Sequence, residues 1–301
     1  MPTGLRGHPH HPIYGGTHQL LYEILESWGI HSVAVPAGDD PALDRAIRET
    51  NNLPAVLIET PTNPTLRMTD IAAAIRASSE RDEPGHIVVD NTFLGPVFQH
   101  PLELGTDLCL YSTSKYLAGF SDMLGGIATG RDPELSGRLK STRALLGKVL
   151  QADEAWLLDS RLPTPSRRMN HQSQNAAEIA EALADHPKVE RIHYPMFLEA
   201  ADQRRIFAEQ CDHPGAVFSL EIAGGKKAAF GFLHHLEITQ NAVSLGGLKS
   251  LACHPATTTH SEMGQEELDR AGVCGRLVRV SVDLEDVRDL IQDYRYALDS
   301  T

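Results

Sequence analysis

The first half of the chain alternates short apolar runs with a segment of helical periodicity. Three apolar runs each end in polar residues, and they occupy positions 55–58, 87–89 and 108–111. The segment 65–82, TLRMTDIAAAIRASSERD, has the apolar spacing of a helix, with Thr69 or Asp70 near its start. Apolar strands separated by helix-length segments predict a parallel sheet that helices cover on both faces.

The second half is patterned differently. Residues 173–195 form a long amphipathic segment, and residues 226–237 and 286–300 have helical spacing. Two further segments, 215–225 and 276–286, alternate in the manner of half-buried strands. This pattern predicts an α+β arrangement.

A domain boundary is predicted near residue 165, where Pro163 and Pro165 interrupt the pattern. Residues 1–165 would form a larger α/β domain, and residues 166–301 a smaller α+β domain.

Composition and charge narrow the class of protein. The chain has 301 residues, 41% of them hydrophobic, and 27 basic against 40 acidic residues give a net charge of −13. This acidity argues against nucleic acid or an anionic membrane as the main partner. The sequence contains neither a run of about 18 apolar residues nor an apolar segment near its start. The four cysteines are far apart and form no CxxC motif, which predicts reduced thiols and a cytoplasmic setting.

Polar groups with complementary chemistry follow the apolar runs. Asn63, Asp90 and the cluster from Ser112 to Lys115 come at or just after the three predicted strand ends, and parallel strands bring such ends to one edge of a sheet. A lysine there can form a Schiff base, and a carboxylate can face a protonated pyridine nitrogen. Ser112 and Ser114 can donate to a phosphate. Taken singly, each has a simpler explanation: a solvated lysine, or an aspartate that caps a helix.

Several longer motifs carry a resemblance to a known family. They occur in this order: YGGTHQLL, ETPTNPTLRMTDI, VVDNTF, QHPLELGTDLCLYSTSKYLAGFSDMLGG, HPKVERIHYP, SLGGLKSLACHPATTTHS and LVRVSVDLED. From Tyr14 to the C-terminus the chain resembles the Cys/Met-metabolism family of pyridoxal-phosphate enzymes. That family includes cystathionine γ-synthase, cystathionine γ-lyase, methionine γ-lyase and O-acetylhomoserine sulfhydrylase.

The resemblance implies roles for residues that surround the cofactor ring. Lys115 matches the lysine that forms the Schiff base, and Asp90 matches the partner of the pyridine nitrogen. Tyr14 matches the tyrosine that stacks on the ring and assists proton transfer. Asn63 matches the amide near the phenolic oxygen of the ring. Lys115 and Tyr14 are therefore the implied catalytic residues.

The resemblance also implies contacts to the phosphate and to the substrate. Ser112 and Ser114 match the phosphate-binding hydroxyls. Arg279 matches the arginine that binds the substrate carboxylate, for which a guanidinium fork is suited. Ser244 and Leu245 match the segment that lines the substrate side.

The implied fold is that of fold-type-I pyridoxal-phosphate-dependent transferases, with a large, mostly parallel α/β domain that is N-terminally incomplete. The implied function is carbon–sulfur lyase or γ-substitution chemistry on cystathionine, methionine or an activated homoserine. The implied cofactor is pyridoxal 5'-phosphate, and the implied assembly is a homodimer or homotetramer.

One departure from the family leaves an alternative open, and a second concerns the substrate-binding arginine. Thirteen residues precede Tyr14, and they do not resemble the N-terminal portion of the family. The alternative is thus a truncated, catalytically weak homologue that acts as a binding or assembly partner. In addition, Asp283 stands where the family usually has glycine, and we expect it to compete for the guanidinium of Arg279.

Histidines are the other candidates for chemistry. His8, His10 and His11 could bind a metal, but a tail interrupted by prolines is the simpler interpretation. His254 and His260 lack a third ligand at a recognisable spacing. The sequence predicts no metal site. It contains no GxGxxG and no GxxxxGK[ST] motif, so it indicates no nucleotide site.

Overall fold

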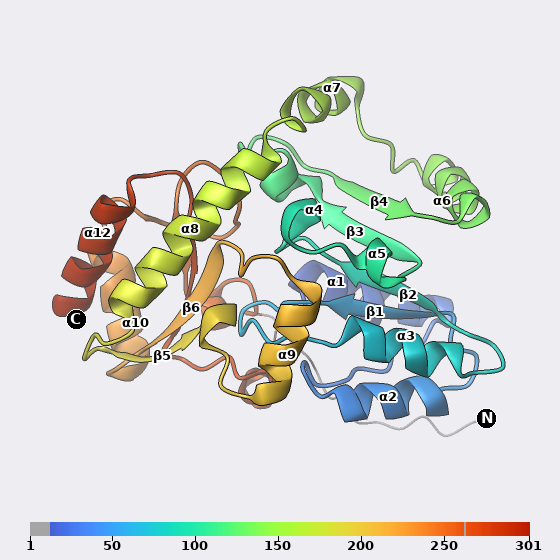
Figure 1. The fold of residues 1–301 in the computed structure, drawn as a ribbon, viewed down its shortest axis with the longest axis horizontal. Helices are drawn as coiled ribbons and strands as arrows, with labels where there is room; N and C mark the ends of the chain where they lie inside the picture. Colours follow the sequence, from blue (N-terminus) through green and yellow to red (C-terminus); the bar gives the residue numbers. More distant parts are fainter. Residues whose placement is uncertain (1–12, 262) are drawn as a thin grey trace.

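The computed structural model describes residues 13–261 and 263–301 and contains two sheets (Figure 1). The strands of the first sheet are β1 (Ala55–Glu59), β2 (His86–Asp90), β3 (Leu108–Ser112) and β4 (Gly126–Gly130), in that spatial order. β1, β2 and β3 are parallel, and β4 is antiparallel to β3. The predicted parallel pairing of the three apolar runs is confirmed, and the carboxyl ends of these strands lie at one edge.

Helices cover one face of this sheet. Ile47 of α2 (Asp40–Glu49) joins a buried cluster with residues of α3 (Ile71–Ser79) and with inward residues of β1 and β2. Helix α3 begins as predicted: the carboxylate of Asp70 accepts a hydrogen bond of 2.8 Å from the backbone N–H of Ala73. On the opposite face, however, Leu57 and Val88 are only half-buried. The expectation of cover on both faces is wrong, because α2 and α3 pack on the same side of the sheet.

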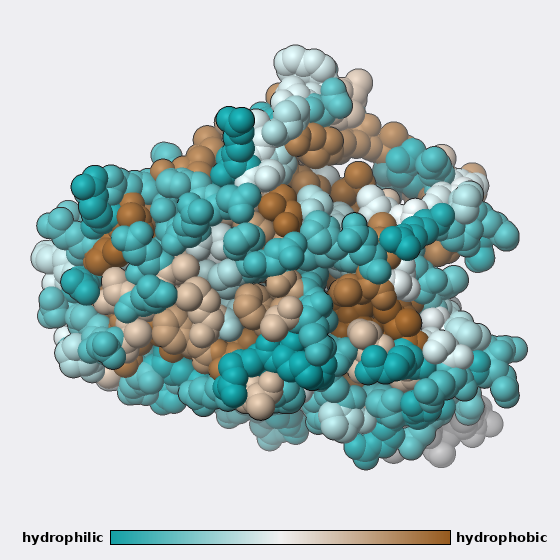
Figure 2. All heavy atoms as spheres, viewed as in Figure 1, coloured by the Kyte–Doolittle hydropathy of each residue, from teal (hydrophilic) through white to brown (hydrophobic). Residues whose placement is uncertain are grey.

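The segment after β4 extends away from the body of the molecule. It carries α6 (Pro133–Leu145) and α7 (Ala152–Arg161), which project beyond the sheet in Figure 1. Every residue of these two helices is described, and none of them is buried. Leu145 is 85% exposed and Trp156 is 68% exposed. Figure 2 shows apolar atoms along this arm and around the hollow beneath it.

The second sheet forms the other half of the molecule. Its strands, in the order β5-β6-β9-β8-β7, are β5 (Val189–His193), β6 (Val217–Ile222), β9 (Leu277–Ser281), β8 (Leu251–Cys253) and β7 (Gln240–Asn241). The main helices of this half are α8 (Pro165–Leu183), α10 (Gly225–His235) and α12 (Val287–Asp299). Buried side chains of these helices and of β6 and β9 form the largest apolar cluster among the described residues.

The central strands β6 and β9 are more deeply buried than their alternation predicted. All their residues are buried, so the expectation of half-buried strands is wrong. Apolar side chains of these strands pack against the helices, and two polar side chains, those of Ser219 and Arg279, bond loop residues of the first half. Ser219, for example, donates a hydrogen bond of 2.8 Å to the carbonyl of Pro64.

Shorter elements complete the chain. They are α1 (Gly15–Gln19), η1 (Leu20–Leu25), η2 (Glu26–Trp28), α4 (Gly95–Phe98), α5 (Pro101–Leu104), η3 (Thr113–Leu117), η4 (Pro195–Phe197), α9 (Ala201–Gln210), η5 (Pro255–Thr257) and α11 (Gln265–Ala271).

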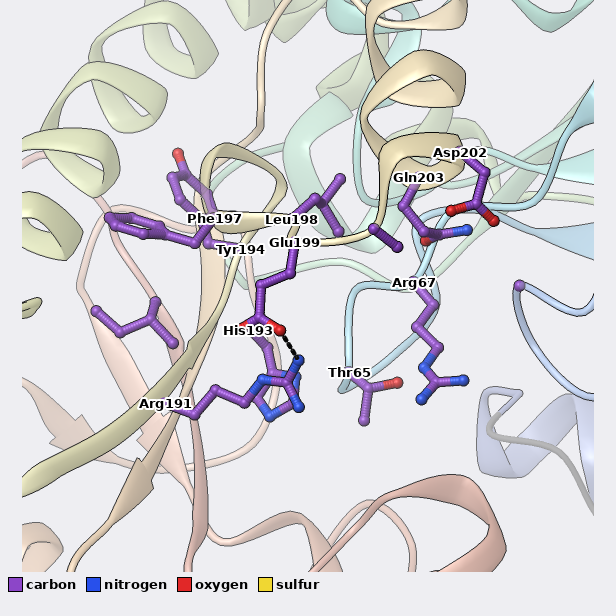
Figure 3. A pocket seen from close by; sticks show the side chains of 13 residues that line it. Thr65, Arg67, Arg191, His193, Tyr194, Phe197, Leu198, Glu199, Asp202 and Gln203 are labelled. Carbon is purple, nitrogen blue, oxygen red and sulfur yellow. Dashed lines mark hydrogen bonds and ion pairs between the residues drawn. The ribbon is translucent and has the colours of Figure 1, made fainter.

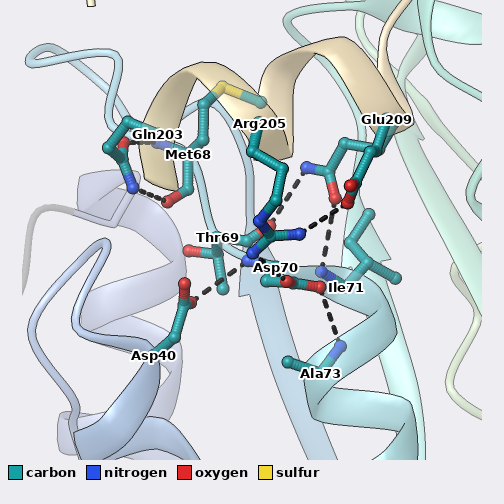
Figure 4. Close-up of polar contacts among 10 residues, drawn as sticks. Asp40, Met68, Thr69, Asp70, Ile71, Ala73, Gln203, Arg205 and Glu209 are labelled. Carbon is teal, nitrogen blue, oxygen red and sulfur yellow. Dashed lines mark hydrogen bonds and ion pairs between the residues drawn. The ribbon is translucent and has the colours of Figure 1, made fainter. Parts of the chain in front are cut away.

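Helix α9 fastens the second half to the loop that precedes α3 (Figure 4). The Gln203 side chain bonds both the N–H and the carbonyl of Met68, at 2.8 and 2.9 Å. Gln210 does the same for the N–H of Ile71 and the carbonyl of Thr69, at 3.3 and 3.0 Å. These side chains therefore satisfy backbone groups of a loop more than 130 positions away.

Two general expectations bear on the whole chain. Within the described part of the chain, no helix is both long and apolar enough to cross a membrane. The boundary near residue 165 stays a prediction; the first sheet ends at Gly130 and the second begins at Val189, with the start of α8 at Pro165 between them.

Candidate active site

The ends of β1 and β2 place two carboxylates side by side. Glu59 and Asp90 are partners in the parallel register, so their side chains emerge on the same face. Asp90 Oδ1 accepts hydrogen bonds from the backbone N–H and the hydroxyl of Thr92, at 3.1 and 2.6 Å. Burial raises the pKa of Asp90, and the two bonds from Thr92 oppose this rise. A cation facing this carboxylate would favour its ionised form.

Lys115 follows the end of β3, within η3. Its Nζ donates a hydrogen bond of 2.7 Å to Oγ of Ser244. Burial lowers the pKa of Lys115, and the positive charge of Arg279 lowers it further. The amine is therefore easier to deprotonate than a solvated lysine, as a nucleophile requires.

Ser244 has an uncommon backbone conformation, with a φ of 100°. For a residue with a side chain, this region costs on the order of 1–3 kcal/mol and persists only where contacts hold it. Here the Ser244 hydroxyl accepts from Lys115, and its carbonyl accepts from Nη2 of Arg279 at 2.9 Å. Leu245, the next residue, is buried. Ser244 thus lies between the two cationic side chains.

Arg279 lies at the centre of β9 and is buried. Its Nη1 donates to Oδ1 of Asn63 at 3.1 Å. Its Nε is also buried, and it has no hydrogen-bond partner among residues 13–261 and 263–301. A buried donor without a partner costs roughly 1–3 kcal/mol. Arg279 therefore retains capacity to bind an acceptor such as a carboxylate.

Asp283 does not compete for Arg279, so that expectation is wrong. Its Oδ1 accepts a hydrogen bond of 2.5 Å from Nε2 of Gln172, on α8. The chain leaves β9 at Ser281, before it reaches Asp283, so the strand alternation no longer directs this side chain toward the Arg279 face. Burial, reinforced by the charge of Glu285, raises the pKa of Asp283 to about 8.

Glu59 was not among the residues predicted from the sequence, yet it links two that were. Its Oε1 accepts from the backbone N–H of Asn63 at 2.9 Å, and its Oε2 accepts from the N–H of Tyr14 at 3.0 Å. Burial and the neighbouring Asp90 carboxylate raise the pKa of Glu59 to about 8. Its place at the end of a buried strand, on the predicted site edge, was the signal available in the sequence.

The two serines lie beside the end of β3. Ser114 Oγ accepts a hydrogen bond of 3.0 Å from the N–H of Gly125, so its hydroxyl proton remains available to donate. The backbone N–H of Ser112 donates to Oγ1 of Thr92 at 2.9 Å. Thr92, which the sequence reasoning also missed, therefore ties Ser112 to Asp90.

Hydrogen bonds connect most of the predicted site. One chain of contacts runs through Lys115, Ser244, Arg279, Asn63, Glu59 and Tyr14, and a second joins Asp90, Thr92 and Ser112. The register of Glu59 with Asp90 joins the two chains. Residues from both halves of the sequence thus meet at the edge of the first sheet.

The histidine candidates lie elsewhere or have protein partners. His8, His10 and His11 fall outside the described residues. His254 Nε2 is 2.9 Å from the carbonyl oxygen of Gly275, and His260 Nε2 is 3.2 Å from that of Asn63. Across residues 13–261 and 263–301, no group of three or more His, Cys, Asp or Glu side chains is placed to hold a metal ion.

A pocket of about 290 Å³ lies apart from this site (Figure 3). Arg67, Arg191, His193 and Gln203 are among the residues that line it, and none of the predicted site residues does. Its charges are largely paired: Arg191 lies 3.4 Å from Glu199, and His193 lies 2.7 Å from Glu221. The pocket therefore offers no chemistry comparable to that at the sheet edge.

The donor set at the sheet edge suits pyridoxal phosphate. It offers an amine of lowered pKa for an aldehyde, a carboxylate for a pyridine nitrogen, a free hydroxyl proton for a phosphate and an unpartnered arginine N–H for a carboxylate. On a mostly parallel sheet backed by helices, this set defines a fold-type-I pyridoxal-phosphate-dependent enzyme.

Comparison with known proteins identifies the family. Residues 9–299 match the family model described as Cys/Met metabolism PLP-dependent enzyme, and the chain belongs to this family. It is 36% identical over 289 residues to cystathionine beta-lyase MetC of Bacillus subtilis, covering 95% of this chain and 72% of that protein. It is 37% identical over 287 residues to L-methionine gamma-lyase of Pseudomonas putida, covering 95% and 71%.

A solved structure agrees. The crystal structure of cystathionine gamma synthase from Xanthomonas oryzae pv. oryzae, in complex with cystathionine, superposes with a TM-score of 0.89 at 36% identity. The match covers 97% of this chain and 76% of that one. The chain is thus a pyridoxal-phosphate-dependent lyase or γ-substitution enzyme of sulfur amino-acid metabolism.

Proposed function

We propose that the sheet-edge site performs elimination or replacement at the sulfur-bearing or activated side chain of an amino acid, with Lys115 and Tyr14 as its catalytic residues. The candidate substrates are cystathionine, methionine and an activated homoserine. The observation that carries this proposal is the placement of Ser244, which accepts from the Lys115 amine at 2.7 Å and from the Arg279 guanidinium at 2.9 Å. One residue thus holds a base and a carboxylate-binding group next to each other.

The cofactor would be held by residues of the first half of the chain. Lys115 would bind its aldehyde, Asp90 would face its pyridine nitrogen, and Ser112 and Ser114 would donate to its phosphate. Tyr14 would stack on its ring and Asn63 would lie near its phenolic oxygen. When bound, pyridoxal phosphate supplies an electron sink for the negative charge that develops at Cα of the substrate.

The side chains then bind the substrate and move its protons. Arg279 binds the substrate carboxylate through its unpartnered Nε, and Ser244 and Leu245 line the substrate side. Once the substrate amine has taken its place at the aldehyde, the Lys115 amine is free, and its lowered pKa would let it remove the proton from Cα and then move a proton at Cβ. Ser244 orients Nζ during this transfer, and Tyr14 assists it as the γ-substituent leaves.

The organisation of the protein is proposed on similar grounds. We propose domains at 1–165 and 166–301, a homodimer or homotetramer, and a cytoplasmic location. The exposed apolar side chains of Leu145 and Trp156 on the α6–α7 arm support an assembly that covers them. The free thiols of Cys109, Cys211, Cys253 and Cys274 support a reducing compartment. No observation favours the alternative of a catalytically weak binding partner.

The test is a product assay with cystathionine, methionine and O-acetylhomoserine, each with and without an added thiol as the second substrate. Elimination predicts ammonia, an oxo acid and the released leaving group, whereas replacement predicts a new thioether without ammonia. Lys115→Ala serves as the matched control and should form no product. The proposal fails if the purified protein binds pyridoxal phosphate but consumes none of the three compounds.

A further inference from the structure

Glu59 occupies a position where a carboxylate is costly. It ends β1, it is half-buried, and its register partner Asp90 is another carboxylate. Like charges at neighbouring positions of a sheet repel each other, and burial penalises the ionised form. A side chain kept at such a place needs compensating contacts.

Those contacts are two backbone N–H groups from separate parts of the chain. Each carboxylate oxygen of Glu59 accepts one of these bonds: Oε1 from the N–H of Asn63 at 2.9 Å, and Oε2 from the N–H of Tyr14 at 3.0 Å. Tyr14 immediately precedes α1, which begins at Gly15, and its side chain is 56% exposed. Asn63 in turn accepts from Arg279 at 3.1 Å. Glu59 therefore joins the Tyr14 segment to the Asn63–Arg279 pair.

We propose that Glu59 is a positioning residue of the active site: its two oxygens fix the Tyr14 and Asn63 backbones relative to each other and so set the separation between the ring-stacking and carboxylate-binding groups. This inference rests on the proposed function, because that function assigns ring stacking to Tyr14 and carboxylate binding to Arg279. The linkage itself is a property of the chain alone and can be measured without cofactor or substrate.

The chain offers a sharp pair of variants. In Glu59→Gln the side chain keeps its size, but it has one acceptor oxygen and one NH₂ group, so it can satisfy only one of the two N–H groups. Asp107→Asn is the matched control. Its Oδ2 also accepts from a sheet backbone N–H, that of Ile87 at 2.7 Å, but it belongs to neither contact chain of the site.

The first measurement is amide hydrogen exchange in the cofactor-free protein. Glu59→Gln should speed exchange at Tyr14 or Asn63 by roughly 10-fold, the range expected for loss of one hydrogen bond, and leave Ile87 unchanged. Asp107→Asn should leave exchange at all three amides unchanged, because the asparagine oxygen can still accept from the single N–H of Ile87. Wild-type exchange at both Tyr14 and Asn63 in Glu59→Gln would overturn the linkage.

The second measurement asks whether the linkage serves the site. Titration with pyridoxal phosphate should show roughly 10-fold weaker binding to Glu59→Gln than to wild type. Asp107→Asn should bind the cofactor as tightly as wild type. With a substrate of the wild-type protein, Glu59→Gln should raise KM and lower kcat, because both Arg279 and Tyr14 lose their placement. Glu59→Asp, which keeps both oxygens, should recover part of the affinity. Unchanged cofactor binding in Glu59→Gln would overturn the positioning role, whereas a wild-type protein that binds cofactor but turns over nothing would overturn the proposed function alone.

Discussion

The Nζ atom of Lys115 lies 2.7 Å from Oγ of Ser244, although 129 positions separate the two residues. Ser244 also accepts from Arg279 through its carbonyl. One residue of the second half thus orients two side chains that need opposite protonation behaviour. Lys115 must lose a proton to act, whereas Arg279 must keep its charge. The positive charge of Arg279 helps the first task, since it lowers the pKa of Lys115.

Removal of the Ser244 hydroxyl should slow turnover more than it weakens substrate binding. We expect Ser244→Gly to lower kcat by roughly 10-fold, the equivalent of one hydrogen bond of about 1.4 kcal/mol, because Nζ loses its acceptor. Glycine tolerates the φ of 100°, so this variant separates the hydroxyl from backbone strain. Steady-state kinetics provide the check. A kcat equal to that of wild type would show that the contact does not orient the amine.

Lys115→Ala should abolish covalent attachment of pyridoxal phosphate while the fold is retained. The side chain is half-buried, and within the described part of the chain its amine bonds only to Ser244, so its removal disturbs little packing. Borohydride reduction followed by intact-mass measurement should find the cofactor adduct in wild type and none in the variant. An adduct of equal yield in Lys115→Ala would assign the attachment to another lysine.

Asp90→Asn should retain the structure and lose most of the turnover, by about 100-fold or more. Asparagine can still accept from Thr92 through Oδ1, but it cannot supply a negative charge to a pyridine nitrogen. The electron sink therefore weakens. Circular dichroism and kcat measured side by side provide the check, and unchanged turnover in a folded variant would refute the assigned role.

Arg279→Lys should raise KM by roughly 10- to 100-fold and leave pyridoxal-phosphate affinity unchanged. Lysine keeps the charge, but it loses the fork whose Nη1 and Nη2 bind Asn63 and Ser244 while Nε remains for an acceptor. The two quantities are measured by substrate titration and cofactor titration. Loss of cofactor binding with unchanged KM is the opposite pattern and would show that Arg279 binds the cofactor rather than the substrate.

Asp283 should make the protein less stable as the pH rises from about 4 to 8. Its pKa of about 8 in the folded protein exceeds the ordinary value of 3.8, so in this range the folded protein holds a proton that the unfolded chain has released. The free energy of unfolding then falls with pH, by at most about 1.4 kcal/mol per pH unit, and the loss is complete above pH 8.

Asp283→Asn should remove this slope, because an amide does not titrate and its oxygen can still accept from Gln172. Other buried carboxyls, Glu59 included, contribute slopes of the same sign, so the informative quantity is the difference between wild type and variant. Urea unfolding at pH 5, 6, 7 and 8 measures it. A difference that does not vary with pH would refute the raised pKa.

The sequence predicted local features of the site well and long-range contacts poorly. Asn63, Asp90 and Lys115 were found because each follows an apolar run, and parallel pairing brings such ends together. The Lys115–Ser244 contact has no local signature; the family resemblance placed Ser244 on the substrate side but did not predict this hydrogen bond. Glu59 escaped notice because a carboxylate at a strand end is ordinary until its N–H donors are known.

The errors have a common physical origin in contacts between residues far apart in the sequence. β6 and β9 alternate polar and apolar residues, which is typical of strands with one face in solvent. Here the polar side chains are buried as well: Ser219 bonds Pro64 and Arg279 bonds Asn63 in loops of the first half, and Glu221 bonds His193 and Arg276. Similarly, Asp283 follows Arg279 closely in sequence, but its partner lies on α8.

The glutamines of α9 limit how this protein can be divided or recombined. Gln203 and Gln210 satisfy four main-chain groups of residues 68–71, and a buried polar group left without a partner costs roughly 1–3 kcal/mol. A fragment that ends before Ala201 would contain the whole first sheet and still lack these partners. A chimera that takes its C-terminal half from a relative would need glutamines, or equivalent side chains, seven positions apart on the corresponding helix. The two glutamines bond only main-chain groups of the loop. The helix of the chimera could therefore come from a relative whose loop has different side chains, provided that the loop backbone follows the same path.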